Sequence, residues 1–244
     1  MLTTTRPTSG EGAQPDLAAL ASLLADRTRA AFCTALLDGR AWTAGELARH
    51  ADVAPSTASE HLTALVEAGL LAEVRQGRHR YVRLASREIA ELIEAMSAAA
   101  PKAAPPRGLR AVHRSNALAR GRTCYDHLAG ALGVAVADAV TRQGWIAWED
   151  GPSLTAEGRT GLAALGAELP ARTRRPLVRS CLDWTERRPH VAGAVGAALC
   201  SRALEAGWLV RPGGGRAVRV TAEGRTVLAG TLGVSGDVLE SAGA

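Results

Sequence analysis

Residues 43–84 read TAGELARHADVAPSTASEHLTALVEAGLLAEVRQGRHRYVRL, and this stretch decides the fold of the first third of the chain. Thr43 followed by Glu46 is a capping-box pattern, in which each side chain can bind a free backbone N–H at the start of a helix. The pattern predicts a short helix that begins after Thr43 and runs to about Ala51.

A second helix and a β-hairpin follow in the same stretch. Pro55 is tolerated in the first turn of a helix, because the N–H that it lacks has no partner there, and Gly69 is a typical helix end. Residues 70–74 and 79–84 surround a turn at 75–78, which predicts two antiparallel strands.

Apolar periodicity extends this domain on both sides. Leucines and alanines recur at helical spacing over residues 16–38, and Gly39 predicts the end of that helix. Ser86 is a typical cap for a last helix over residues 87–98. Three helices, a hairpin and a final helix in this order predict a winged helix-turn-helix domain over residues 15–99.

The second half of the chain contains an internal repeat. Three pairs of segments match in order: 127–133 with 190–196, 144–145 with 207–208, and 155–160 with 221–226. Parts of the second copy also match the first domain, since EAGLL at 67–71 corresponds to EAGWL at 205–209. We therefore expect a linker at 100–108 and a C-terminal domain, 109–244, of two degenerate winged-helix-like repeats at about 109–169 and 170–240. The expected fold class is mainly α with small β-hairpins.

Composition fits a soluble protein of two domains. The 244 residues are 47% hydrophobic and 22% charged, with a formal net charge of +5 that permits a nucleic-acid partner. No apolar run is long enough to cross a membrane, and the polar residues 1–14, which we expect to be disordered, lack a secretory signal. We therefore expect a cytoplasmic protein with four reduced cysteines. No phosphate-binding glycine loop, nucleophile elbow or metalloprotease motif occurs, so we expect no enzyme.

Residues 17–96 resemble the ArsR/SmtB family of bacterial repressors. The segments that carry the resemblance are DRTR at 26–29, GELA at 45–48, STASEHL at 56–62, EAGLL at 67–71 and GRHRY at 77–81. The resemblance implies a homodimer formed by the first and last helices of the domain, with one recognition helix per subunit in the major groove of an operator. It also implies repression that an effector relieves.

The familiar metal sites of that family are missing from this sequence. Metal-sensing members carry cysteines in the helix before the recognition helix, where this chain reads ELARH at 46–50. Others use aspartate and histidine on the last helix, which here reads REIAELIE at 87–94 and has no histidine. The resemblance therefore does not supply a metal effector for this chain.

The predicted DNA contacts lie on the recognition helix and on the hairpin. The major groove accepts a narrow polar helix face, and a wing places cations against phosphates or in the minor groove. The candidate contacts are Ser56, Thr57, Ser59, Glu60, His61, Arg75, Arg78, His79 and Arg80. The alternatives are a solvated helix face and an edge hairpin protected by charge. The basic run from Lys102 to Arg122 extends this footprint, binds an anionic effector or is a solvated face.

Matching residues of the two repeats form a candidate effector site. They are Cys124 and His127 in the first repeat and Cys181 and His190 in the second. If packing of the repeats brings them together, four such ligands can hold zinc. Alternatively, thiols beside arginine and histidine can act as a redox switch. In the third alternative the cysteines are core residues, and Asp126 and Asp183 are helix caps.

Tryptophan is concentrated in the same half. Trp148 and Trp184 have no counterpart in the other repeat and are candidates to line an apolar ligand pocket, whereas Trp145 and Trp208 match a buried strand position. Cys33 and Cys200 are also expected in the core.

These observations predict a sequence-specific DNA-binding regulator, a repressor released by an effector in its C-terminal half. A metal ion or a thiol-reactive small molecule are candidate effectors, and no cofactor is specified. The alternatives are a constitutive DNA-binding protein whose C-terminal half is purely structural, and an enzyme fused to a winged helix.

Overall fold

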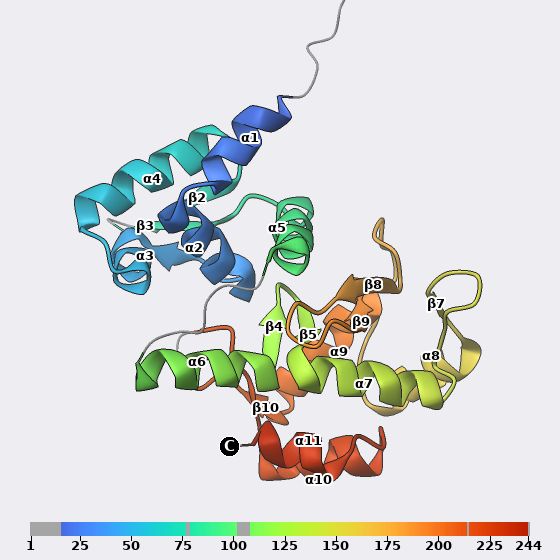
Figure 1. The fold of residues 1–244 in the computed structure, drawn as a ribbon. Coiled ribbons are helices and arrows are strands. Elements are labelled where there is room, and N and C mark those ends of the chain that lie inside the picture. The colour runs from blue at the N-terminus through green and yellow to red at the C-terminus, as the bar shows by residue number, and fades with distance from the viewer. Residues whose placement is uncertain (1–15, 77–78, 102–107, 214, 244) are drawn as a thin grey trace, which may run out of the picture.

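The N-terminal part of the chain folds as a winged helix-turn-helix domain (Figure 1). The computed structural model describes residues 16–76, 79–101, 108–213 and 215–243. The helices of this domain are α1 (Leu17–Leu24), α2 (Arg27–Ala35), the 3-10 helix η1 (Leu36–Asp38), α3 (Ala44–Ala51), α4 (Pro55–Glu67) and α5 (Arg87–Ala99). Strands β1 (Trp42–Thr43), β3 (His79–Leu84) and β2 (Leu71–Gln76) form one antiparallel sheet in that order. The predicted mainly α fold with small hairpins is confirmed.

Local capping and apolar faces explain these elements. Glu46 N donates to Thr43 Oγ1 at 3.2 Å while Thr43 N donates to Glu46 Oε2 at 2.7 Å, which is the predicted capping box of α3. The inner faces of α2, α3 and α4 meet in a core where Phe32, Leu47 and Leu62 are fully buried. Burial of these faces holds α3 and α4 in the helix-turn-helix arrangement.

The prediction of a single helix over residues 16–38 is wrong. The chain forms α1, α2 and η1 there, because Asp26 Oδ1 accepts a hydrogen bond from Arg29 N at 2.9 Å and caps a new helix. Gly39 ends η1 as expected, in the left-handed conformation with φ of 76°. Strand β2 extends to Gln76, beyond the predicted 70–74, and turn residues 77–78 lie outside the described residues.

The C-terminal half consists of two copies of one unit, preceded by α6 (Leu109–Arg120) and followed by α11 (Gly236–Ser241). Each copy has a hairpin, a 13-residue helix, a second hairpin and a nine-residue helix. The first copy comprises β4 (Arg122–Cys124), β5 (His127–Ala129), α7 (Gly130–Arg142), β6 (Ile146–Ala147), β7 (Ser153–Leu154) and α8 (Ala156–Ala164). The second comprises β8 (Arg179–Leu182), β9 (Pro189–Ala192), α9 (Gly193–Glu205), β10 (Leu209–Val210), β11 (Arg219–Val220) and α10 (Ala222–Gly230). No helix among the described residues is long and apolar enough to cross a membrane.

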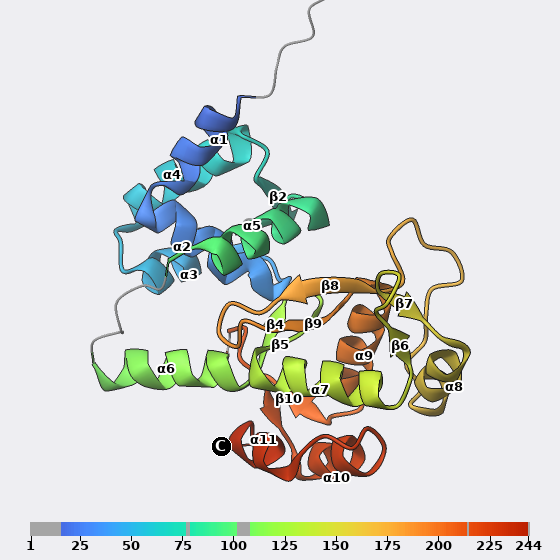
Figure 2. The same ribbon diagram turned by 45° about the vertical axis from the view of Figure 1, so that its right-hand side comes forward.

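The two copies pack reciprocally around their first hairpins. Helix α7 packs on β9, α9 packs on β5, and β5 contacts β9 (Figure 2). The second glycine of the repeated HxAGxxG motif allows each long helix to approach its own hairpin. A Cβ on Gly133 would lie 2.5 Å from the Leu128 carbonyl oxygen, and one on Gly196 would lie 2.3 Å from that of Val191. Both copies share one apolar core, which includes Leu132 and the matching Val195.

The winged helix-turn-helix domain rests on these hairpins through η1 and α5. Tyr125 N, in the turn between β4 and β5, donates to Leu37 O at 2.8 Å. Arg179 of β8 lies 3.2 Å from Glu91 of α5 as an ion pair. In Figures 1 and 2, α5 lies above β8 and to its left. The first hairpins of the repeats therefore connect the two halves of the molecule.

Candidate functional site

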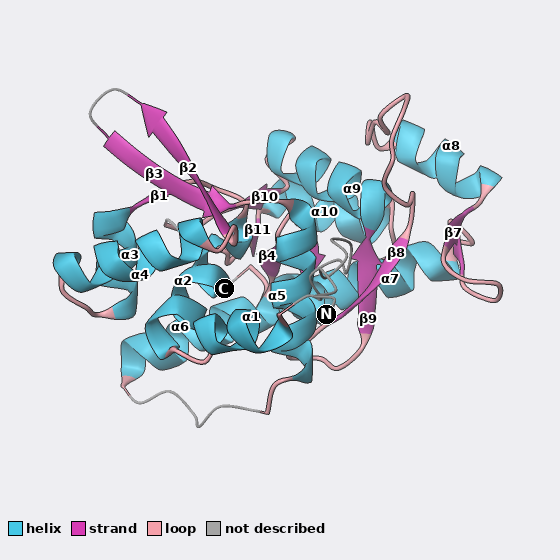
Figure 3. Ribbon diagram, turned by 90° about the horizontal axis from the view of Figure 1, so that it is seen from above, coloured by secondary structure: helices cyan, strands magenta, loops and turns pink. Residues whose placement is uncertain are grey.

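Helix α4 presents a polar face outward from the domain. Ser56, Ser59 and Glu60 are exposed and Thr57 is half-buried, whereas Ala58 and Leu62 point into the core with no exposed surface. The helix lies at the outer edge of the molecule in Figures 1 and 3. Hydroxyl and carboxylate groups are therefore available along one side of the helix, which is what recognition of base edges requires.

His61, also predicted as a DNA contact, is turned toward α2. Its Nδ1 lies 3.3 Å from Arg29 Nη1 and 3.8 Å from Asp26 Oδ1, and its ring meets Phe32 edge to face. The imidazole is only 20% exposed. His61 thus ties α4 to α2, and only the outer part of its ring faces solvent.

The β2–β3 hairpin projects from the domain as the predicted wing (Figure 3). Arg75 and Arg80 lie directly opposite each other on the two strands, and both contact Glu73, which reduces the repulsion between them. Arg75 is 80% exposed and Arg80 33% exposed. Arg78 lies outside the described residues, and His79 is placed only as a member of β3, paired with Gln76.

The basic run after the domain divides into exposed and buried parts. Arg110 and Arg114 are exposed on α6, whereas residues 102–107 lie outside the described residues. Arg122 is fully buried, so the expectation that it joins a DNA footprint or a solvated face is wrong. Its guanidinium pairs with Asp183 at 2.9 Å and lies 4.4 Å from the ring centroid of Trp184. Arg122 therefore joins the first repeat to the second.

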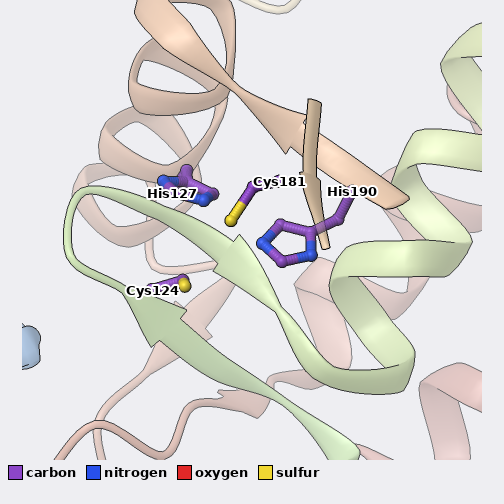
Figure 4. A group of neighbouring side chains, drawn as sticks. All are labelled: Cys124, His127, Cys181 and His190. Carbon is purple, nitrogen blue, oxygen red and sulfur yellow. The ribbon is translucent and has the colours of Figure 1, made fainter. Parts of the chain in front are cut away.

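The four predicted cysteine and histidine residues form a buried cluster between the repeats (Figure 4). The members are Cys124, His127, Cys181 and His190, and one potential ligand atom from each lies within 4.8 Å of the others. The strand register explains the cluster, because each cysteine is directly opposite its histidine within a hairpin. The reciprocal contact of β5 with β9 then brings the two pairs together, and the imidazole centroids are 5.1 Å apart.

An aspartate lies near each histidine outside the cluster, but only Asp126 is hydrogen-bonded to its histidine, because neither nitrogen of His190 has a hydrogen-bond partner among the described residues. Asp126 Oδ1 lies 3.3 Å from His127 Nδ1, and Asp183 Oδ2 lies 3.5 Å from His190 Nδ1. The Nε2 atoms of both rings are buried and have no hydrogen-bond partner among the described residues. Each ring therefore has one nitrogen near a carboxylate and one nitrogen available to bind a ligand.

These aspartates are not caps of the helices that follow them. Asp126 lies in the turn between β4 and β5 and also binds Arg175 Nη1 at 2.8 Å. Asp183 accepts a hydrogen bond at 2.7 Å from Gly130 N, the first residue of α7 in the other repeat. Asp183 therefore binds a helix N-terminus, as predicted. The helix is α7 of the other repeat and not the one that follows Asp183, because the packing of the two copies brings them together.

Burial and mutual contact shift the pKa values within the cluster. The hydrogen bond from the Cys124 thiol, reinforced by both histidines, lowers the pKa of the Cys181 thiol well below its ordinary value, although burial opposes the shift. Burial raises the pKa of Cys124. Burial alone lowers the pKa of His127, but the hydrogen bond with Asp126 and the nearby Cys181 and Glu94 groups outweigh it and raise the pKa to about 9. Without a metal, the cluster therefore favours a Cys181 thiolate beside a charged imidazole.

Glu94 reaches this cluster from α5 of the DNA-binding domain. Its side chain is buried, Cys181 Sγ lies 3.7 Å from its Oε2, and its Oε1 has no hydrogen-bond partner among the described residues. Burial raises the pKa of Glu94 to about 7. Glu94 is not among the residues predicted for the site. A signal for it was present, because Glu94 follows Ala90 and Ile93 on the buried side of α5.

A cavity of about 520 Å³ opens beside the cluster, between the two halves of the molecule. Its charged lining residues are Asp38, Arg40, Arg87, Asp126, Arg175 and Arg211. Trp148 and Trp184, predicted to line a pocket, are not part of this lining. Trp148 Nε1 donates to Thr141 Oγ1 at 3.0 Å, and Trp184 faces Arg122.

The other two cysteines are buried in the apolar cores, and Cys200 also lines the cavity. Cys33 and Cys200 are buried, and burial raises their pKa values to about 11 and about 12. Both therefore remain protonated thiols at neutral pH, in contrast to Cys181.

Comparisons with known proteins agree with the first domain. Residues 24–74 match a family model described as a helix-turn-helix domain. Among solved structures, reduced HlyU from Vibrio cholerae N16961 aligns with 35% of this chain and 88% of its own, at 26% identity and a TM-score of 0.31. The homodimeric winged helix-turn-helix domain Mb0332 from Mycobacterium bovis, described as possibly of the ArsR family, aligns with 36% and 88%, at 25% identity and a TM-score of 0.32.

One curated relative covers nearly the whole molecule. The uncharacterized HTH-type transcriptional regulator YdfF of Bacillus subtilis (strain 168) is 43% identical over 214 residues, which are 86% of this chain and 94% of the relative. It is named as a regulator and not as an enzyme. The match spans both halves, so the C-terminal repeats are shared and not a separate addition to this chain. With the winged-helix fold and the matched helix-turn-helix model, this relationship shows that the chain belongs to the family of HTH-type transcriptional regulators.

Proposed function

We propose that the protein is a cytoplasmic, dimeric repressor that binds a specific operator and is released from it by an effector bound in the C-terminal half. The outward polar face of α4 is the observation that carries the proposal. Ser56, Ser59 and Glu60 are exposed on a helix whose other face is fixed in the core, so they can enter the major groove without disturbing the fold.

The wing and the recognition helix make different kinds of contact in this proposal. Arg75 and Arg80 on the hairpin contact phosphates, which positions the domain without reading sequence. Glu73 holds the two arginines on one face of the hairpin. Ser59 and Glu60 on α4 contact base edges and supply the sequence preference. Binding should therefore depend on salt through the wing and on sequence through the helix.

Apolar side chains on α1 and α5 support a homodimer. Leu17 on α1 is 73% exposed and Met96 on α5 is 42% exposed, although both belong to helices whose opposite faces are packed. The resemblance to ArsR/SmtB repressors implies that these two helices form the subunit interface. A second copy of the chain would bury both side chains.

The effector part of the proposal is supported by the position of the Cys/His cluster. The cluster lies beneath α5, and Glu94 of that helix contacts it. An effector that changes the environment of Glu94 can shift α5, and with it the spacing of two recognition helices in a dimer. Ligand control requires that the effector bind one spacing more tightly than the other.

A footprinting experiment tests DNA binding. The full chain should protect a pseudo-palindromic site upstream of its own gene, with half-sites about one helical turn apart. Ser59→Ala should change the preference among duplexes, whereas Arg188→Ala, at an exposed position in the C-terminal half, should not. Absence of any symmetric protected site would contradict the proposal, and a site whose affinity no effector alters would favour the constitutive alternative.

A further inference from the structure

The Cys/His cluster contains two buried histidines in addition to two buried thiols, and a core role for the cysteines does not explain the histidines. Its four members come from two equivalent hairpins, and all are buried at one point between the repeats. We propose that Cys124, His127, Cys181 and His190 form a Cys2His2 binding site for zinc(II), and that the ion is the effector of the proposed repressor. The second part rests on the proposed function, whereas the first part stands without it.

The spacing of the ligand atoms suits a tetrahedral ion. Zinc–sulfur bonds of about 2.3 Å and zinc–nitrogen bonds of about 2.0–2.1 Å place the four ligand atoms about 3.3–3.8 Å apart. The atoms here lie within 4.8 Å of one another, so a contraction of about 1.5 Å at most completes the coordination. Short strands joined by turns can make that adjustment without breaking their register.

The two histidines favour a metal over a disulfide. A disulfide between Cys124 and Cys181 would explain the cysteines but not the two imidazoles, whose buried Nε2 atoms have no partner among the described residues. Metal-binding histidines commonly have a carboxylate near the second ring nitrogen, which fixes the ring orientation. Asp126 has this contact with His127 Nδ1, and Asp183 lies 3.5 Å from His190 Nδ1.

The charge of the site also suits zinc(II). Binding releases the remaining thiol and imidazolium protons, so that two thiolates and two neutral imidazoles hold the ion. Two negative charges then balance the doubly positive ion, which is what a site without solvent contact requires. Magnesium and calcium prefer oxygen ligands and are poor candidates.

A crevice of about 10 Å³ next to His127 connects this site with α5. Glu91 and Glu94 of α5 line it together with Asp126, and the three arginines Arg87, Arg175 and Arg179 line it as well. An ion held by Cys181 would lie beside Glu94, because Cys181 Sγ is 3.7 Å from Glu94 Oε2. Occupancy of the site therefore changes the charge that Glu94 faces, and α5 carries this change to the DNA-binding domain.

Cobalt(II) is a direct spectroscopic probe of the site. The full chain, stripped of metal with a chelator, should bind one equivalent of cobalt(II) and show thiolate-to-cobalt charge-transfer bands and intense tetrahedral d–d bands. Zinc(II) should displace it. Cys200→Ser, a buried cysteine of the same half outside the cluster, should leave the spectrum unchanged, whereas Cys124→Ser with Cys181→Ser should abolish the charge-transfer bands. A folded wild-type protein without these bands would overturn the site.

A milder variant keeps the test valid where cysteine variants fail to fold. Asp126→Asn retains all four ligands but weakens the support of His127, so zinc(II) affinity should fall about 10–100-fold with the tetrahedral spectrum retained. Unchanged affinity in this folded variant would contradict the assigned role of the aspartate, and with it the coordination through His127 Nε2.

The coupling to DNA is tested separately. Zinc(II) should change the operator affinity of the wild type by about 5–150-fold, and Glu94→Gln should reduce this response while retaining the cobalt spectrum. Equal operator affinity with and without zinc(II) would overturn the effector role. A chain that binds no operator in either state would overturn the proposed function, but the cobalt spectrum would still decide the metal site.

Discussion

Replacement of Arg122 by methionine should strongly destabilise the C-terminal half. The Arg122 guanidinium is fully buried and donates to Asp183 Oδ2 at 2.9 Å and to Leu118 O at 3.0 Å, with Trp184 against its face. Methionine keeps the apolar stem but lacks most of the guanidinium group, so the variant removes the charge and its hydrogen bonds and also leaves a space beside Trp184.

The expected decrease is about 3–5 kcal/mol of the free energy of unfolding, because Asp183 then remains buried without its cation. Asp183 would keep its hydrogen bonds from Gly130 N at 2.7 Å and Thr185 N at 2.8 Å, which prevent it from simply turning toward solvent. The double variant Arg122→Met with Asp183→Asn should be destabilised by less than the sum of the two single variants, because it removes the unpaired charge.

Arg188→Met is the matched control. Arg188 also joins the second repeat to the first, through a 2.8 Å contact with Asp138, but these side chains are 57% and 38% exposed. An exposed pair contributes about 0–1 kcal/mol. Urea unfolding followed by circular dichroism should therefore separate the two variants clearly. If Arg122→Met were no more destabilising than Arg188→Met, burial would not be what makes the Arg122–Asp183 pair important.

Three further predictions concern other parts of the chain. Arg75→Ala and Arg80→Ala should weaken binding to all duplexes. The slope of log affinity against log salt concentration should fall by about 1 for each phosphate that the variant no longer neutralises. A change in sequence preference alone would contradict their positioning role. Hydrogen bonds from Thr43 lower the pKa of Glu46 in the folded state, so its contribution to stability is present above its unfolded pKa and is lost as pH falls through the folded value. Urea midpoints between pH 6 and pH 3 should thus fall less steeply in Glu46→Gln than in the wild type, and equal slopes would refute this. Iodoacetamide at pH 8 should label Cys33 and Cys200 only after unfolding, since burial raises their pKa values to about 11 and about 12, and rapid labelling of the folded chain would show that one of them is accessible.

The DNA-binding domain could be predicted from sequence because its signals are local. The Thr43–Glu46 capping box, Pro55 at the start of α4 and Gly69 after its end act within a few residues of where they stand. The prediction of one helix over residues 16–38 failed because a local signal was overlooked. Leucine periodicity continues across Asp26, and only the hydrogen bond that this aspartate makes shows that a new helix begins.

The C-terminal site could be predicted only in part. The repeat aligned Cys124 with Cys181 and His127 with His190, which was sufficient to expect them near a shared interface. The hairpins that hold these pairs were not predicted, since three- and four-residue strands give little periodic signal. Burial of Arg122 was missed because charge in a sequence does not show a partner 61 residues away.

The proposed metal site is nearly symmetric, but its surroundings are not. This difference determines which neighbouring element a bound ion can affect. Each hairpin supplies one cysteine, one histidine and one nearby aspartate, so an ion pulls equally on both repeats. Glu94 contacts the cluster at Cys181, on one side, and it belongs to the helix that the ArsR/SmtB resemblance assigns to the dimer interface. The core shared by the two repeats keeps them together, so in the proposed mechanism the inward shift of the hairpins on metal binding also changes their contact with α5. In the proposed mechanism, the metal site therefore acts on α5, and α5 acts on the spacing of the recognition helices.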